Sequence, residues 1–247
     1  MEQNKFKKQY LGSGINVFVS DEHTFGTDAM LLADFAKIKP RDIPMDMGTG
    51  CGIIPLIWCK NEALKQVHCL DIQEQAVEQV RQAIDLNSLE NRLFVHHCDL
   101  REIRKHFDAE CFTAVTMNPP YKPLSTGIES SSASDKIARH ETMCSLDDAV
   151  KAGAFLLKFG GRMCMCHRPE RLTDILCCMR ANNLEPKVVR FVCDKEGKEP
   201  FLVLVQARKG GKSGVRVKSQ LVLRKPNGDF TDEVFEIYGS YSEGYKR

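Results

Sequence analysis

An asparagine followed by two prolines and a tyrosine, Asn118-Pro119-Pro120-Tyr121, is the segment whose chemistry is most specific in this chain. An apolar run, Phe112 to Met117, precedes it and predicts a buried strand that stops at a rigid turn. Both prolines lack an N–H group and have a fixed φ angle, so the carbonyl groups beside them keep one geometry. Those oxygens can accept hydrogen bonds from an amino group, and the tyrosine can stack on a planar ring. The segment therefore predicts a binding site for a flat amine.

A glycine-rich turn upstream could hold the molecule that reacts with this amine. Its sequence is Asp46-Met47-Gly48-Thr49-Gly50-Cys51-Gly52, and it lies between an apolar run at 43–45 and an apolar segment at 53–58. This order predicts strand, turn and helix. Glycines let the backbone approach a ligand closely, and the helix start offers N–H groups to a carboxylate or phosphate. Nicotinamide and flavin proteins use a related turn, so the turn by itself does not name the ligand.

Three acids stand at the ends of predicted strands. Asp46 could contact a cofactor or cap the glycine loop. The next strand ends at Asp71, about twenty residues past the turn, where an acid commonly binds ribose hydroxyls. Asp99 follows a third strand and could cap a helix that begins near Arg101.

Together, these motifs in this order resemble class I S-adenosylmethionine-dependent methyltransferases that methylate amino groups. The resemblance implies that Asp71 holds the ribose of the cofactor, that Asp99 meets its adenine, and that Asn118, Pro119, Pro120 and Tyr121 are catalytic. It implies an S-adenosylmethionine site, without a metal, that is formed by Asp46, Gly48, Gly50, Gly52, Asp71, Ile72, Asp99, Leu100 and Asn118.

Further segments resemble one branch of these enzymes along nearly the whole chain. They are Phe25–Phe35, Arg139-His140-Glu141 and Gly160-Gly161-Arg162. The branch is that of bacterial tRNA adenine methyltransferases, which modify the exocyclic amine of the adenine beside the anticodon of a valine tRNA. The resemblance implies RNA, most specifically tRNA, as the partner. It also gives Thr27 and Asp28, otherwise capping residues, a place beside the cofactor.

The resemblance further predicts RNA contacts by Lys122 and Arg139, although residues 139–141 could equally form salt bridges at a helix start. In the expected mechanism, the Asn118 side-chain oxygen and the Pro119 carbonyl accept the two N–H bonds of the amine. Tyr121 stacks on the base, which is worth roughly 1–3 kcal/mol. The serine-rich loop 122–135 is expected to become ordered over the target base, the alternative being a disordered linker.

The charge distribution suggests RNA more than the net charge does. The formal net charge of the 247 residues is only +2. No acidic residue occurs from Ala207 to Gly228, a segment rich in lysine and arginine. Such a cluster can neutralise phosphates, or it can protect a solvated sheet edge. With the resemblance we favour phosphate contact, through Arg208, Lys209 and Lys212.

The cysteines and the apolar runs bear on the cellular compartment. The chain has 11 cysteines, several of them in predicted strands, where they are expected to be small buried hydrophobes in a reducing cytosol. Cys164-Met165-Cys166-His167 lacks a second ligand pair with zinc-site spacing, so core packing is expected there. We find no signal peptide and no apolar run long enough to cross a membrane. These patterns predict a cytoplasmic protein without a membrane partner.

Alternating patterns predict a single α/β domain with a Rossmann-like, mostly parallel sheet and an antiparallel edge hairpin. Residues 1–36 are the expected N-terminal arm and cap helix, with Thr27 as N-cap; 37–207 are the core and 208–247 a small basic C-terminal extension. Gly160-Gly161 is expected to end a helix. The predicted strands are Ile43–Asp46, Gln66–Asp71, Leu93–His97, Phe112–Met117, Arg162–His167, Lys187–Val192 and Phe201–Ala207, and the predicted helices are Ile53–Cys59, Gln75–Asn87, Leu146–Leu157 and Arg171–Ala181.

Several other functions share parts of these motifs. Glutamine methylation of a protein such as a release factor uses the same Asn-Pro-Pro-Tyr motif, but too few residues precede the glycine turn for the usual substrate-binding domain. DNA adenine methylation usually needs a target-recognition domain, which is not evident, and guanine methylation of ribosomal RNA is a third alternative. A non-catalytic nucleic-acid-binding module and a nicotinamide-dependent oxidoreductase fit the intact motif less well. The oligomeric state is not predicted.

Overall fold

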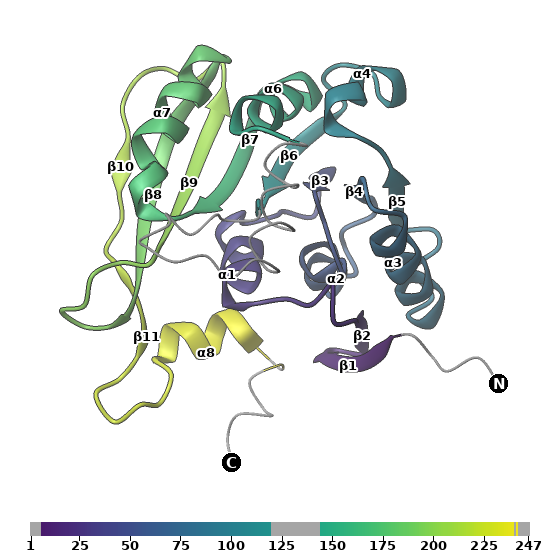
Figure 1. Cartoon of the computed structure of the whole chain (residues 1–247), viewed down its shortest axis with the longest axis horizontal. Helices are drawn as coiled ribbons and strands as arrows, with labels where there is room; N and C mark the ends of the chain where they lie inside the picture. Colours follow the sequence, from purple (N-terminus) through teal and green to yellow (C-terminus); the bar gives the residue numbers. More distant parts are fainter. Residues whose placement is uncertain (1–5, 120–143, 240, 242–247) are drawn as a thin grey trace, which may run out of the picture.

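The computed structural model describes residues 6–119, 144–239 and 241 (Figure 1). The predictions made for Pro120, Tyr121, Lys122, Arg139 and the loop 122–135 concern residues outside this described part. Asn118 and Pro119 lie inside it, at its edge.

The described residues form a central sheet of nine strands in the order β10-β8-β9-β7-β6-β3-β4-β5, with β11 also paired to β8. Strands β7, β6, β3, β4 and β5 run parallel, whereas β9 is antiparallel to both of its neighbours. This confirms the mostly parallel sheet with an antiparallel hairpin, and it places β10 and β11 outside that hairpin. The strands are β3 (Pro44–Met47), β4 (Val67–Asp71), β5 (Leu93–His97), β6 (Phe112–Met117), β7 (Leu157–His167), β8 (Leu184–Lys195), β9 (Leu202–Lys209), β10 (Arg216–Val217) and β11 (Leu221–Arg224).

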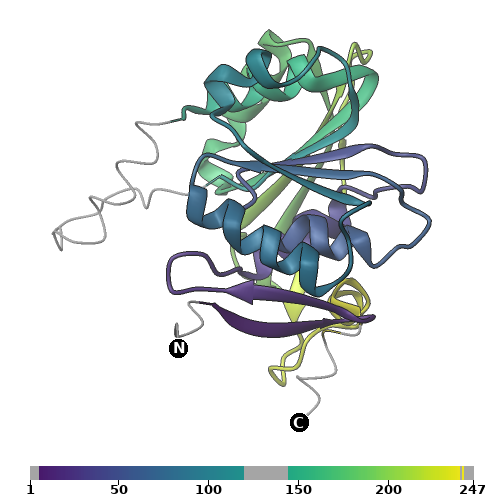
Figure 2. The ribbon, with the colours of Figure 1, turned by 90° about the vertical axis from the view of Figure 1, so that its right-hand side faces the viewer.

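Helices cover both faces of this sheet (Figure 2). The helices α1, α2 and α3 bury their apolar side chains in one hydrophobic cluster, and α4, α6 and α7 bury theirs in a second cluster on the other face. The apolar positions of α3 recur at helical spacing, which explains why one of its sides is buried. The helices are α1 (Thr27–Phe35), α2 (Ile53–Cys59), α3 (Glu74–Leu86), α4 (Ile103–His106), α6 (Leu146–Leu156), α7 (Leu172–Ala181) and α8 (Asp232–Tyr238), with 3-10 turns at Leu100–Glu102 and Pro169–Arg171.

A separate two-stranded sheet precedes the core. Strands β1 (Lys7–Gly12) and β2 (Ile15–Val19) pair antiparallel, and β2 packs on α2 and α3. The Asn87 side chain at the end of α3 accepts from the Asn16 N–H and donates to the Asn16 carbonyl, both at 2.8 Å. Strand β1 was not expected, because its first four residues are polar or exposed and show no apolar alternation.

Two local predictions were wrong. Thr27 is not the N-cap of α1; Gly26 is, and Thr27 is the first helical residue. Gly160 and Gly161 do not end a helix either. The helix α6 ends at Leu156, and β7 begins immediately, so both glycines lie inside β7. Pairing of β7 with β6 is interrupted there, and a Cβ at Gly161 would lie 2.9 Å from a backbone carbonyl.

The described elements that follow β9, from β10 to α8, are part of the main structure. Strands β10 and β11 lie parallel to β8, and α8 packs against α1 and β11 (Figure 1). Strand β9 continues to Lys209, two residues past the expected end of the core.

Candidate active site

Four described parts of the predicted catalytic and cofactor site lie at one edge of the sheet. Because β3, β4, β5 and β6 are parallel neighbours, their carboxyl ends meet at the same edge. The glycine turn follows β3, Asp71 ends β4, Asp99 follows β5 and Asn118 follows β6. In open α/β sheets, ligands bind at this edge.

The glycine turn leaves open space at its outer side. Gly48 and Gly50 have φ angles of +66° and +55°, and a Cβ at either position would meet nothing within 4 Å. A ligand can therefore approach the backbone there. Gly52 is required for a different reason, because its Cβ would lie 2.8 Å from the Val80 side chain of α3. The absence of a side chain at Gly52 lets α3 pack beside the turn.

Asp71 holds the glycine turn to the end of β4. Its Oδ2 accepts from the Gly50 N–H and its Oδ1 from the Gln73 N–H, both at 2.9 Å. The residue is only 5% exposed. Both carboxylate oxygens thus have a backbone partner, a structural role that the sequence pattern did not indicate. The neighbouring Ile72 accepts from His97 Nε2 through its carbonyl.

Asp46 lies beneath the turn, buried against the adjacent strand β6. It accepts a hydrogen bond from Thr116 Oγ1 at 2.6 Å, and it is 1% exposed. Burial raises the pKa of its carboxyl group from 3.8 to about 7. The hydrogen bond from Thr116 lowers this pKa, but its effect is smaller than that of burial. Asp46 therefore joins β3 to β6 at the point where the site begins.

Asn118 is held from both ends of its side-chain amide. Its Nδ2 donates to Asp28 Oδ2 at 3.1 Å, and its Oδ1 accepts from Cys166 Sγ at 3.0 Å. An ionised carboxylate only accepts, so the NH₂ group must face Asp28 and the oxygen must face away from it. This assigns the two ends of the amide. Asp28, which was predicted to bind the cofactor, is thus brought to the predicted catalytic residue.

Asp99 caps the short 3-10 turn that follows β5. Its side chain accepts from the Arg101 N–H at 2.9 Å and pairs with the Arg101 guanidinium at 2.5 Å. The capping interpretation is confirmed. The hydrogen bond and the positive charge of Arg101 hold the pKa of Asp99 below its usual value. Leu100, the next residue, is half-buried.

The predicted phosphate-binding residues are not brought near Asn118. Strand β9 runs antiparallel to β7, with Val203 opposite His167 and Arg208 opposite Arg162. Arg208 therefore lies opposite the middle of β7, away from its carboxyl end. Its Nε donates to the Gly160 carbonyl at 2.9 Å. Lys209 is also bound locally, to the Leu157 carbonyl at 2.8 Å and to Glu110 at 3.0 Å. An RNA contact by Arg208, Lys209 and Lys212 remains a prediction, on the opposite edge of the sheet.

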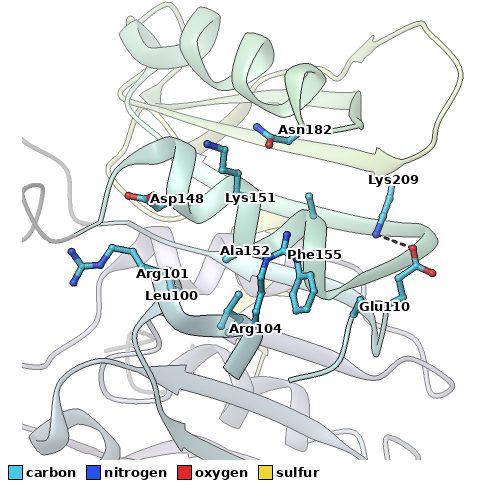
Figure 3. A pocket seen from close by; sticks show the side chains of 13 residues that line it. Leu100, Arg101, Arg104, Glu110, Asp148, Lys151, Ala152, Phe155, Asn182 and Lys209 are labelled. Atoms are coloured by element: carbon cyan, nitrogen blue, oxygen red, sulfur yellow. Dashed lines mark ion pairs between the residues drawn. The ribbon is translucent and has the colours of Figure 1, made fainter. Parts of the chain in front are cut away.

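A cavity of about 630 Å³ lies between α4 and α6, and two predicted site residues, Leu100 and Lys209, are in its lining (Figure 3). Its lining includes Arg101, Arg104, Lys151 and Lys209, but neither Asn118 nor the glycine turn. Arg101, Lys151 and Lys209 each form an ion pair with an acid, and the Arg104 guanidinium lies 4.4 Å from the centre of the Phe155 ring. The cationic lining is therefore largely neutralised.

None of the described cysteines forms a disulfide, and Cys69, Cys164, Cys166 and Cys193 are buried in their strands as expected. Among the described residues, we find no group of three or more His, Cys, Asp or Glu side chains that could hold a metal ion. None of the helices in this same part of the chain is long and apolar enough to span a bilayer.

The sheet order, the glycine turn after its first parallel strand and the acids at its carboxyl edge define a class I methyltransferase fold. A solved structure described as a predicted O-methyltransferase from Agrobacterium tumefaciens has this fold: the TM-score is 0.67, covering 86% of this chain and 95% of that one at 19% identity. Residues 10–139, more than half of the chain, match the family described as methyltransferase small domain. The chain belongs to this family, and it is an S-adenosylmethionine-dependent methyltransferase.

Two relatives extend the similarity over most of the chain. Both are named tRNA1(Val) (adenine(37)-N6)-methyltransferase. The protein of Tolumonas auensis is 25% identical over 213 residues, covering 86% of each chain. That of Phocaeicola vulgatus is 28% identical over 181 residues, covering 73% of this chain and 74% of its own. Membership of the methyltransferase family rules out the oxidoreductase alternative.

Proposed function

We propose that this enzyme transfers a methyl group from S-adenosylmethionine to the exocyclic amine of an adenine in tRNA, beside the anticodon. The observation that carries the proposal is the hydrogen bond from Asn118 to Asp28, which leaves the amide oxygen facing away from the carboxylate. That oxygen is the acceptor an amine needs. The names of the relatives in Tolumonas auensis and Phocaeicola vulgatus support adenine in tRNA as the substrate.

The residues at the carboxyl edge fit the methyl donor. The open space at Gly48 and Gly50 admits its amino-acid part close to the backbone. The Asp71 carboxylate would accept from its ribose hydroxyls, and the Asp99 carboxylate would accept from its adenine amine. When bound, S-adenosylmethionine supplies an electrophilic methyl carbon.

The protein's part in the reaction is to position the amine. An exocyclic adenine amine is a weak nucleophile because its lone pair is delocalised into the ring. If Asn118 Oδ1 and the Pro119 carbonyl accept its two N–H bonds, the nitrogen becomes more pyramidal and its lone pair points away from both oxygens. Alignment of this kind lowers the barrier without a base. The methylated nitrogen is acidic and gives its proton to water.

Cys166 and Asp28 both help to hold the acceptor oxygen in place. The Cys166 thiol is fully buried and is a weak donor to Asn118 Oδ1. Asp28 prevents the amide from turning its NH₂ group toward the substrate, where two donors would face each other.

The test is methyl transfer from radiolabelled S-adenosylmethionine to separate pools of tRNA, ribosomal RNA, DNA and protein. The proposal predicts label in tRNA, which Asn118→Ala abolishes and Asn227→Ala, an exposed turn variant, retains. Label that appears instead in ribosomal RNA, DNA or protein would refute it, and the protein outcome would transfer the assignment to glutamine methylation.

A further inference from the structure

We propose that the C-terminal helix α8 positions the Asn118 amide, through Tyr238, Thr27 and Asp28. The catalytic consequence rests on the proposed function. The geometric part, that α8 sets the orientation of the Asn118 side chain, does not.

Helix α8 is firmly attached to the core. Val234 is fully buried, and Tyr238 is 5% exposed. The Glu233 carboxylate forms an ion pair with Arg190 of β8 at 2.7 Å, and the hydrogen bond and charge of Arg190 lower the pKa of Glu233. The Tyr238 ring packs against Phe230 and Tyr241, with centroids 5.4 and 6.2 Å apart. The helix can therefore hold another element in place.

The element that α8 holds is the start of α1 (Figure 1). Tyr238 Oη lies 3.1 Å from Thr27 Oγ1, within hydrogen-bond distance. The Phe25 ring, on the loop that leads into α1, lies 6.0 Å from the Tyr241 ring. The Thr27 side chain does not cap its own helix. Among the described residues, its hydroxyl instead makes its polar contact with the Tyr238 hydroxyl.

The start of α1 in turn places the Asn118 partner. Asp28 follows Thr27, and one of its carboxylate oxygens folds back over Gly26, where a Cβ would lie only 2.7 Å from Asp28 Oδ1. The other oxygen, Oδ2, accepts from Asn118 Nδ2. Because Asp28 is the second residue of α1, a displaced helix start carries its carboxylate along and changes this hydrogen bond. A shift of α1 relative to α8 therefore moves the acceptor that orients Asn118.

This arrangement makes Tyr238 and Thr27 positioning residues. Apolar contacts by Val234 and the aromatic rings secure α8 without the hydroxyl pair, so loss of one hydroxyl should leave the fold intact. What the pair adds is a directional contact one residue away from Asp28. We therefore expect its loss to change the Asn118 amide more than the stability of the protein.

The direct test follows the side-chain amide resonance of Asn118 in ¹H–¹⁵N spectra of the full chain, assigned through its loss in Asn118→Ala. Tyr238→Phe and Thr27→Val should each shift this resonance, whereas Thr27→Ser, which keeps the hydroxyl, should not. Tyr10→Phe is the matched control, because Tyr10 is 58% exposed on the N-terminal hairpin. An unchanged Asn118 resonance in Tyr238→Phe overturns the proposal, whatever the substrate is.

The kinetic test measures methyl transfer to the macromolecule that the wild-type enzyme labels. Tyr238→Phe should lower kcat about 3- to 10-fold, with the dissociation constant of S-adenosylmethionine and the melting temperature unchanged, and Thr27→Val should lower kcat to the same extent. The double variant should be no slower than either single one, because both remove the same contact. The proposal would be contradicted if the losses in kcat were additive in the double variant. It would also be contradicted if Thr27→Ser were as slow as Thr27→Val. If the wild type labels no tRNA, the proposed function fails while the amide resonance still decides this inference.

Discussion

The Asp28 carboxylate accepts a hydrogen bond from the Asn118 side-chain amide, with 3.1 Å between Oδ2 and Nδ2, across 90 positions of the sequence. The contact connects the start of α1 to the carboxyl end of β6. It orients the amide because a carboxylate cannot donate. The side chain that would receive the substrate amine is thus set by a residue on a different element.

Replacing Asp28 by asparagine tests this orientation. An asparagine can present either its oxygen or its NH₂ group to Asn118, so the amide of Asn118 can turn over. We expect kcat/KM for methyl transfer to fall about 10- to 100-fold, which corresponds to about 1.4–2.7 kcal/mol of transition-state stabilisation. Asp34→Asn is the control, because Asp34 lies on the same helix and pairs with exposed Lys37. Equal rates in both variants would show that Asp28 does not orient the amide.

Gly26→Ala should act through the same carboxylate. The backbone at Gly26 is extended, with φ at −113°, so alanine is not strained there. Its Cβ would nevertheless lie 2.7 Å from Asp28 Oδ1, and the carboxylate must move. Steady-state kinetics should show about a 10-fold loss of activity with little change in melting temperature. In an Asp28→Ala background, Gly26→Ala should cause no further loss of activity. If it still lowers activity about 10-fold there, the effect does not act through the Asp28 carboxylate.

Asp71→Asn is expected to weaken cofactor binding. Asparagine has one side-chain oxygen, so one of the N–H groups of Gly50 and Gln73 would lose its acceptor. An unsatisfied buried donor costs about 1–3 kcal/mol, which predicts a lower melting temperature and a more mobile glycine turn. Calorimetric titration should show S-adenosylmethionine binding weakened about 10-fold or more. Asp85→Asn, exposed on α3, should bind as the wild type does.

The raised pKa of Asp46 predicts a pH-dependent stability. Its folded-state pKa of about 7 exceeds the usual 3.8, so the folded state holds a proton that the unfolded state has released between these values. The contribution of protonated Asp46 is therefore fully present below about pH 4 and is lost as the pH rises toward 7. Denaturant unfolding from pH 4 to 8 should show the wild type losing more stability than Asp46→Asn. Parallel profiles would mean that Asp46 titrates normally.

The basic cluster at the end of β9 predicts a salt-dependent RNA contact. Replacing Arg208, Lys209 and Lys212 by alanine should weaken tRNA binding and flatten its dependence on salt concentration. Lys209 also holds Glu110 and the Leu157 carbonyl, so its loss can destabilise the fold. Lys212→Ala alone separates the effects, with a salt slope reduced by about one and an unchanged melting temperature. Binding that is unchanged across the salt series would exclude the contact.

The order of strands, turns and helices could be predicted because apolar runs and the glycine turn are local signals. The structural role of Asp71 in holding the glycine turn could not be predicted. Its partners are backbone N–H groups whose direction depends on the folded turn. Cys166 lies opposite Asn118 only through the register of β6 and β7, which spacing alone does not give. The Thr27–Tyr238 contact joins residues 211 positions apart, on elements for which the sequence offers no pairing rule. Gly160-Gly161 misled the prediction because a glycine pair signals an interruption in a strand as well as a helix end.

The most direct test of the central claim is to map the methylated nucleotide. Purified tRNA that lacks the modification is incubated with S-adenosylmethionine and the enzyme, and then digested for nucleoside and fragment mass spectrometry. We predict N6-methyladenosine beside the anticodon of a valine tRNA, formed by the wild type and absent with Asn118→Ala. Methylguanosine, a methyl group elsewhere in the tRNA, or full activity of Asn118→Ala would contradict the account.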